Sequence, residues 1–174
     1  RQQVSETRAQ FESAENVAIM DKISAHVDEY QKSFGRYVEI DKKADLDQKE
    51  MERAAQELED ALEKMRSKQT EQSRSMITKG ASGSELLEEL READAANRMI
   101  KWLLQARRDE KNMMLRNDEK SIQEIKSGLD NMMSLGKEML SGSEREASKK
   151  AAEVVIKEVQ SYRIALESFI AGMV

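Results

Sequence analysis

The absence of proline from all 174 residues is the feature that most restricts this fold. Proline interrupts helices, so a chain that lacks it can keep one helix running over many residues. Only seven glycines are present, and the residues with the highest helix propensities (Ala, Glu, Lys, Met, Leu, Gln and Arg) are abundant. We therefore predict an all-α fold: an elongated antiparallel bundle of long helices.

The composition also narrows the possible functions. Charged residues make up 36% of the chain and aromatic residues 4%, a balance that suits thin seams between helices better than a thick globular core. The net charge of -5 disfavours a nucleic-acid partner, since phosphate binding needs a concentrated basic face. No apolar run reaches the roughly 18 residues of a membrane span.

Three helices are expected, at about 5–77, 84–140 and 144–173. Turn residues around Gly80 separate the first two, and Ser82 with Glu85 has the spacing of a capping box, as does Ser143 with Glu146. In the first predicted helix, apolar residues recur at steps of about three and four and so form a seam, that is, one apolar stripe that can face another helix. Its residues are Ile23, Val27, Tyr30, Phe34, Tyr37, Ala44, Met51, Ala54, Leu58, Ala61 and Met65.

The second helix carries a seam whose phase slips partway along. It reads Leu86, Leu90, Ala93, Ala96, Ile100 and Leu103, then Leu115, Ile122, Ile125, Leu129, Met132 and Met139. A slip of about one residue near Asn117 and Asp118 predicts a kink or stutter there.

The third seam repeats the first at a constant offset of 132 residues, as from Tyr30 to Tyr162. The paired residues are Ile23, Val27, Tyr30, Phe34 and Tyr37 with Val155, Val159, Tyr162, Leu166 and Phe169. Heptad seams also produce such matches by chance, so two unrelated bundle helices remain the alternative. A true repeat predicts a single two-unit domain over 1–174 without the opening helix of its first unit.

A cluster of cations interrupts the second seam. Between 98 and 116 it comprises Arg98, Lys101, Arg107, Arg108, Lys111 and Arg116, against two acids. Arg107 lies three and four residues from Leu104 and Leu103, so we expect it to face the apolar stripe and to need an anion. That anion is either a glutamate of a neighbouring helix or an external carboxylate, which the arginine fork binds well. Tyr162 is either a further donor or a core aromatic.

Signs of catalysis or metal binding are lacking. His26 is the only histidine, and a single imidazole with no cysteine in the chain cannot form a typical metal site. The sequence holds neither a Glu-x-x-His pair nor a phosphate-binding glycine loop, and it shows no nucleophile with its base. We expect a protein that is not an enzyme and that uses no cofactor or metal.

Segment 105–118, QARRDEKNMMLRND, resembles the helical bimodular sensor domain of bacterial methyl-accepting chemoreceptors. The pattern of that family is Ala-Arg-Arg-x-Glu-Lys-Asn/Asp-Phe-Leu-Leu-Arg-Gly-Asp, and this chain departs from it at Met113, Met114 and Asn117. The resemblance implies an elongated domain of two stacked four-helix-type modules. It also implies that this domain is periplasmic and dimeric, belongs to an inner-membrane receptor and binds a small organic acid. It also implies that Arg107 and Arg108 contact the ligand carboxylate, with Lys111 and Arg116 in support.

Two alternatives stay open beside a directly sensing chemoreceptor domain. The chain could be a structural or protein-binding bundle, which predicts that Arg107 pairs with a buried glutamate and has no vacant pocket beside it. It could also be the sensor domain of a histidine kinase that acts through a periplasmic binding protein.

Overall fold

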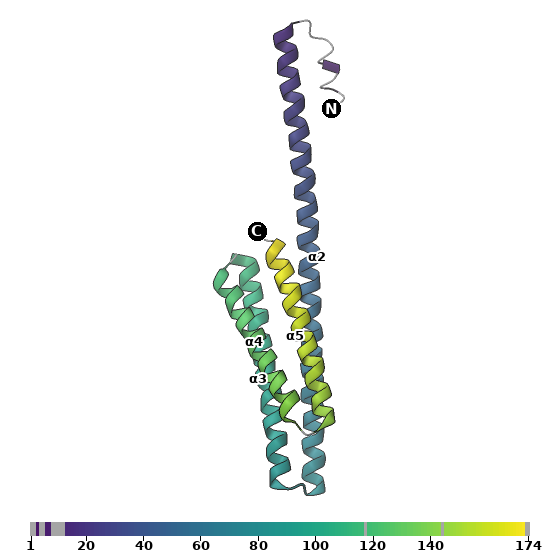
Figure 1. Ribbon diagram of the computed structural model, residues 1–174, viewed down its shortest axis with the longest axis vertical. Coiled ribbons are helices and arrows are strands. Elements are labelled where there is room, and N and C mark those ends of the chain that lie inside the picture. Colours follow the sequence, from purple (N-terminus) through teal and green to yellow (C-terminus); the bar gives the residue numbers. More distant parts are fainter. Residues whose placement is uncertain (1–2, 4–5, 8–12, 117, 144, 173–174) are drawn as a thin grey trace. The chain divides into compact units, whose positions relative to one another are not determined.

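The computed structural model describes residues 3, 6–7, 13–116, 118–143 and 145–172. Its helices are α2 (Ala14–Lys79), α3 (Gly83–Arg116), α4 (Glu119–Gly142) and α5 (Glu146–Gly172) (Figure 1). No strand occurs among these residues, so the all-α prediction is confirmed. The chain divides into two compact units, 1–46 and 47–174. Most of the predicted helical stretch between 5 and 13 lies outside the described residues.

Unit 47–174 is an antiparallel bundle made by the second half of α2 together with α3, α4 and α5 (Figure 1). α3 packs against α4, and α4 packs against α5. The Ser168 hydroxyl of α5 donates to Asp47 Oδ1 of α2 over 3.1 Å, and the Ser73 hydroxyl of α2 donates to Glu89 of α3 over 3.3 Å. These contacts place the four helices around one core.

The turn predicted around Gly80 is confirmed. Gly80 has a φ of +68°, the left-handed conformation that glycine adopts without steric cost, and α2 ends there in a Schellman motif. The Ala81 N–H donates to the Met76 carbonyl, and the Gly80 N–H donates to the Ile77 carbonyl. The capping box is also present, since the Ser82 N–H donates to Glu85 over 2.8 Å.

The single kinked helix expected over 84–140 is wrong, because the chain reverses direction after Arg116. α3 and α4 form an antiparallel hairpin, in which Gly128 of α4 lies against the backbone of Trp102 in α3. Asp118 starts α4: its backbone is extended and its carboxylate accepts from the Lys120 N–H over 3.1 Å. This cap offers the backbone an alternative to continuing α3. Asn117 lies outside the described residues.

The seam expected along α3 is confirmed at Ala96 and Leu103, but elsewhere the observed seam lies one residue away from the expected one. Leu90 is 66% exposed and Leu115 is 83% exposed, although both were expected in the seam. The side chains that are buried belong to Glu89, Glu92, Ala95, Ala96, Met99, Leu103, Ala106, Asp109, Glu110 and Met113. Several positions of the observed seam hold acids. A prediction that considers only apolar residues therefore selects the exposed leucines beside them.

Close approach of α4 and α5 at Gly136 generates a stability prediction. A Cβ at Gly136 would lie 2.9 Å from Cγ1 of Ile156, whereas one at Gly128 would meet only the Trp102 carbonyl at 3.7 Å. Alanine gains about 0.5–1 kcal/mol of helix propensity at either site, and overpacking costs about 1–3 kcal/mol. In urea unfolding, Gly128→Ala should raise the free energy of unfolding and Gly136→Ala should lower it. An equal gain in both variants would contradict the close approach.

Candidate functional site

Arg107 lies at the edge of the core and already has an anionic partner. Its Nη1 donates to Glu110 Oε1 over 2.7 Å and to Oε2 over 3.0 Å, one turn further along the same helix. The Arg107 side chain is 28% exposed, while that of Glu110 is 3% exposed. The guanidinium of Arg107 therefore lies beside the apolar stripe. The sequence had predicted that Arg107 itself faces the stripe, but Glu110 is the charged residue that is buried there.

Tyr162 of α5 completes this group. Its hydroxyl donates to Glu110 Oε2 over 2.5 Å, and the ring is fully buried among core side chains. Glu110 thus accepts hydrogen bonds from α3 and from α5 at the same time. We name Arg107, Glu110 and Tyr162 the carboxylate cluster.

The cluster favours the charged arginine and the neutral tyrosine. Burial by itself would lower the pKa of Arg107, but the charge of Glu110 and the hydrogen bond to it outweigh burial and raise the pKa. Burial also raises the pKa of Tyr162 well above its usual range. The charge of Glu110 and the hydrogen bond to its carboxylate add to this shift.

The other predicted ligand-binding residues are not brought into this cluster. Arg108 is exposed, and its Nε and Nη2 each lie 3.2 Å from Asp109 Oδ1. Lys111 and Arg116 are exposed as well. Asp109 is fully buried, and its Oδ2 has no hydrogen-bond partner, which makes it an energetically costly core residue.

A second polar cluster, unexpected from the sequence, joins the turn between α4 and α5 to α3. Arg145 forms an ion pair with Glu89, and its Nη2 lies 2.7 Å from Glu92 Oε2. The hydroxyls of Ser143 and Ser148 donate to Glu92 over 2.9 and 2.7 Å. The Ser143 hydroxyl, expected to cap α5 with Glu146, instead accepts from the Arg145 N–H over 3.1 Å.

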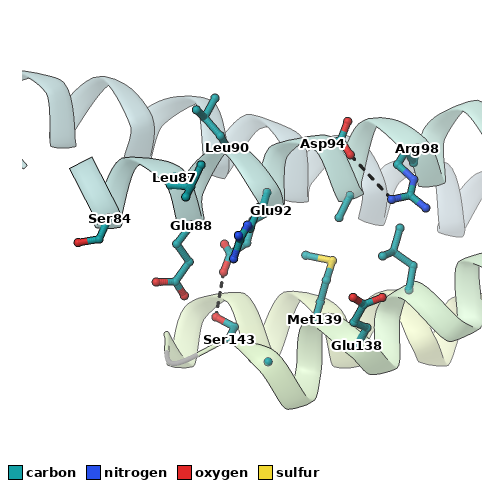
Figure 2. A pocket seen from close by; sticks show the side chains of 14 residues that line it. Ser84, Leu87, Glu88, Leu90, Glu92, Asp94, Arg98, Glu138, Met139 and Ser143 are labelled. Carbon is teal, nitrogen blue, oxygen red and sulfur yellow. Dashed lines mark hydrogen bonds and ion pairs between the residues drawn. The ribbon is translucent and has the colours of Figure 1, made fainter. Parts of the chain in front are cut away.

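Beside this second cluster runs a groove of about 750 Å³ between α3 and α4. Figure 2 shows Ser143 meeting Glu92 at one end and Asp94 paired with Arg98 on α3. Leu87 and Met139 contribute apolar side chains to its lining. None of the five predicted ligand-binding residues lines this groove or the three smaller hollows described on the surface.

The buried acids are the residues that sequence reasoning missed. A detectable signal existed, because the steps between 89, 92, 96, 99, 103, 106, 110 and 113 alternate strictly between three and four. Only the charge of Glu89, Glu92 and Glu110 hides this seam, since acids are rarely placed in a core without a partner.

Within the described residues, no group of three or more His, Cys, Asp or Glu side chains is placed to hold a metal ion. The same residues include no helix that is long and apolar enough to cross a membrane. Comparison of the chain with protein-family models and with curated proteins finds no match.

The raised pKa of Tyr162 predicts a loss of stability in alkaline solution. Above about pH 10 the unfolded chain releases this proton while the folded bundle keeps it, so the free energy of unfolding falls as the pH rises. Urea unfolding between about pH 8 and about pH 11 should show a flatter decline for Tyr162→Phe than for the wild type. Tyr37→Phe, which changes an exposed tyrosine, should keep the wild-type slope.

Removing the cation of the second cluster should destabilise the bundle. Arg145→Met leaves Glu89 and Glu92 buried without their counter-charge, at a cost of about 3 kcal/mol. Arg98→Met removes an exposed arginine that lies 3.9 Å from Asp94 and 5.4 Å from the centre of the Trp102 ring, and it should cost about 1 kcal/mol or less. Chemical denaturation of the two variants measures the difference, and similar losses would show that the Arg145 pairs carry little energy.

Proposed function

We propose that this chain is a sensor domain of a bacterial transmembrane receptor, which binds a small organic acid at the carboxylate cluster and transmits the signal by helix repacking. The observation that supports the proposal is the carboxylate of Glu110, held by Arg107 and by Tyr162 from another helix. An external carboxylate would find the same two donors. The assignment to the periplasmic part of a membrane-anchored receptor rests on the resemblance of segment 105–118.

The cluster gives a physical route from binding to repacking. Glu110 links α3 to α5 through its bond to Tyr162, so a ligand that takes Arg107 and Tyr162 must break this link. Such a ligand shifts the packing only by its different affinities for the two arrangements. Binding therefore competes with the internal Glu110 contact, and the energy of that contact sets the threshold for the response.

A second candidate function has its own support. Arg107 is neutralised within its own helix, and the hollows described on the surface do not include it among their lining residues. This is the arrangement expected of a structural or protein-binding bundle, in which the cluster fixes the register of α3 against α5. It also suits a sensor that acts through a binding protein.

Isothermal titration with a panel of mono- and dicarboxylic acids separates these functions. Under the sensor proposal, Glu110→Gln removes the internal competitor and should tighten binding of the responsive acid by about tenfold, equivalent to about 1.4 kcal/mol. Arg107→Ala should abolish binding, because the charge-assisted contact is lost.

Arg98→Ala serves as the control, since Arg98 is an exposed arginine on the same helix and pairs with Asp94. It should leave the affinity unchanged. If no acid binds to either the wild type or Glu110→Gln, direct sensing is rejected and the protein-binding bundle is the better description.

A further inference from the structure

The groove between α3 and α4 shares no lining residue with the carboxylate cluster. The buried part of its lining, which we call the floor, is apolar and is formed by Ala95, Leu135 and Met139. Leu87 and Leu90 of α3 also line the groove, and they are 52% and 66% exposed. An apolar floor that is continued by exposed leucines differs from the single apolar residues that are ordinary on protein surfaces, and it is typical of interaction sites.

The two walls of the groove have the spacing of helix faces. The wall on α4 has the steps i, i+3, i+4 and i+7, and its residues are Leu135, Glu138, Met139 and Gly142. The wall on α3 begins at Ser84 and ends at Arg98, a length of about 21 Å at the helical rise per residue. Both walls therefore run along the axes of their helices. A groove of this shape and length fits a further helix of about four turns.

The charges of the lining favour a cationic occupant. Four carboxylates and two guanidinium groups line the groove, from Glu88, Glu92, Asp94, Glu138, Arg91 and Arg98. Glu92 is paired with Arg145, and Asp94 lies 3.9 Å from Arg98. Within the part of the chain that the structure describes, Glu88 and Glu138 have no ion-pair partner. Arg91 is then one cation against two carboxylates.

Glu88 and Glu138 lie on opposite walls of the groove, the first on α3 and the second on α4. Figure 2 shows Glu88 pointing toward α4, and Glu138 with Met139 pointing toward α3. A helix in the groove would meet a carboxylate on each flank and apolar side chains beneath it. Lysine or arginine on both sides of an apolar stripe complements this arrangement, whereas a second copy of the same hairpin would bring like charges.

We propose that the groove between α3 and α4 binds a cationic amphipathic helix of a partner protein. The apolar face of that helix packs on Leu87, Leu90 and Met139, and its lysines or arginines pair with Glu88 and Glu138. Binding in this way adds a helix to the bundle. It does not depend on the binding of an organic acid, because the carboxylate cluster lies outside the groove.

Fluorescence anisotropy of the whole chain with two panels of labelled peptides tests the proposal. The peptides have about 16 residues, with leucines at steps of three and four, and the residues beside the leucines are lysines in one panel and glutamates in the other. The best lysine peptide should bind at least about ten times more tightly than its glutamate counterpart, and salt should reduce the difference. In methyl NMR spectra, the Met139 resonance should shift on binding and that of Met51, a core residue outside the groove, should not.

The apolar contact is tested by Leu87→Gln with Leu90→Gln. This variant keeps good helix propensity and should weaken binding of the lysine peptide by about tenfold or more, because two apolar contacts are lost. The matched control is Leu104→Gln with Leu115→Gln, which changes two exposed leucines of the same helix that lie outside the groove. The control should bind the peptide like the wild type.

The charge contact is tested by Glu88→Gln with Glu138→Gln. This variant should weaken binding by about threefold to tenfold at low ionic strength, and its affinity should depend less on salt. Glu63→Gln with Glu153→Gln changes two exposed carboxylates of α2 and α5 and should leave the affinity unchanged. If a leucine variant folds poorly, the carboxylate variants and the Met139 resonance still decide.

Three results would overturn the proposal: no lysine peptide binds up to about 1 mM, the two panels bind equally, or the leucine control weakens binding as much as the groove variant. A fourth would replace it with a second copy of this chain in the groove. In that case the wild type self-associates in sedimentation experiments, and Leu87→Gln with Leu90→Gln makes it monomeric.

Discussion

The uninterrupted heptad phase of α2 is the constraint on which the rest of this structure depends. A single helix that repeats its apolar residues at alternating steps of three and four presents one apolar seam. Such a seam either packs against other helices or is exposed to solvent. From Met51 to Met65 the seam is covered by helices of the same chain, which turn back at Gly80, after Arg116 and after Gly142. From Ile23 to Tyr37 the large side chains of the same seam are exposed.

Buried acids are the second organising element, because they decide how the helices meet. Apolar seams slide past one another with little penalty, whereas a buried carboxylate is stable only opposite its donors. Glu110 is held by Arg107 and Tyr162, and Glu92 is held by Ser143, Ser148 and Arg145. The two clusters fix α3 against α5 and against the turn between α4 and α5.

Prediction from the sequence succeeded where the signal was local and failed where it required a partner. The turn at Gly80 and the box of Ser82 with Glu85 are formed by neighbours in the chain, and both were identified from residue types alone. The seam of α3 was only partly identified, because Glu89 and Glu92 are buried through contacts with residues 16 to 56 positions away in the sequence. The reversal of the chain after Arg116 was predicted only as a kink. A slip in the apolar pattern shows that the helix is interrupted, but it does not show by how much the direction of the chain changes.

By itself, the sequence determined an all-α chain with long heptad seams, a glycine turn and a cation-rich segment in α3. Backbone preference and side-chain periodicity are properties of each segment, so they need no knowledge of the neighbours. The tertiary structure alone decided which charges become core residues. Arg107 flanks the seam and Glu110 occupies it, because the buried carboxylate receives donors from two helices, and only their packing brings Tyr162 within reach.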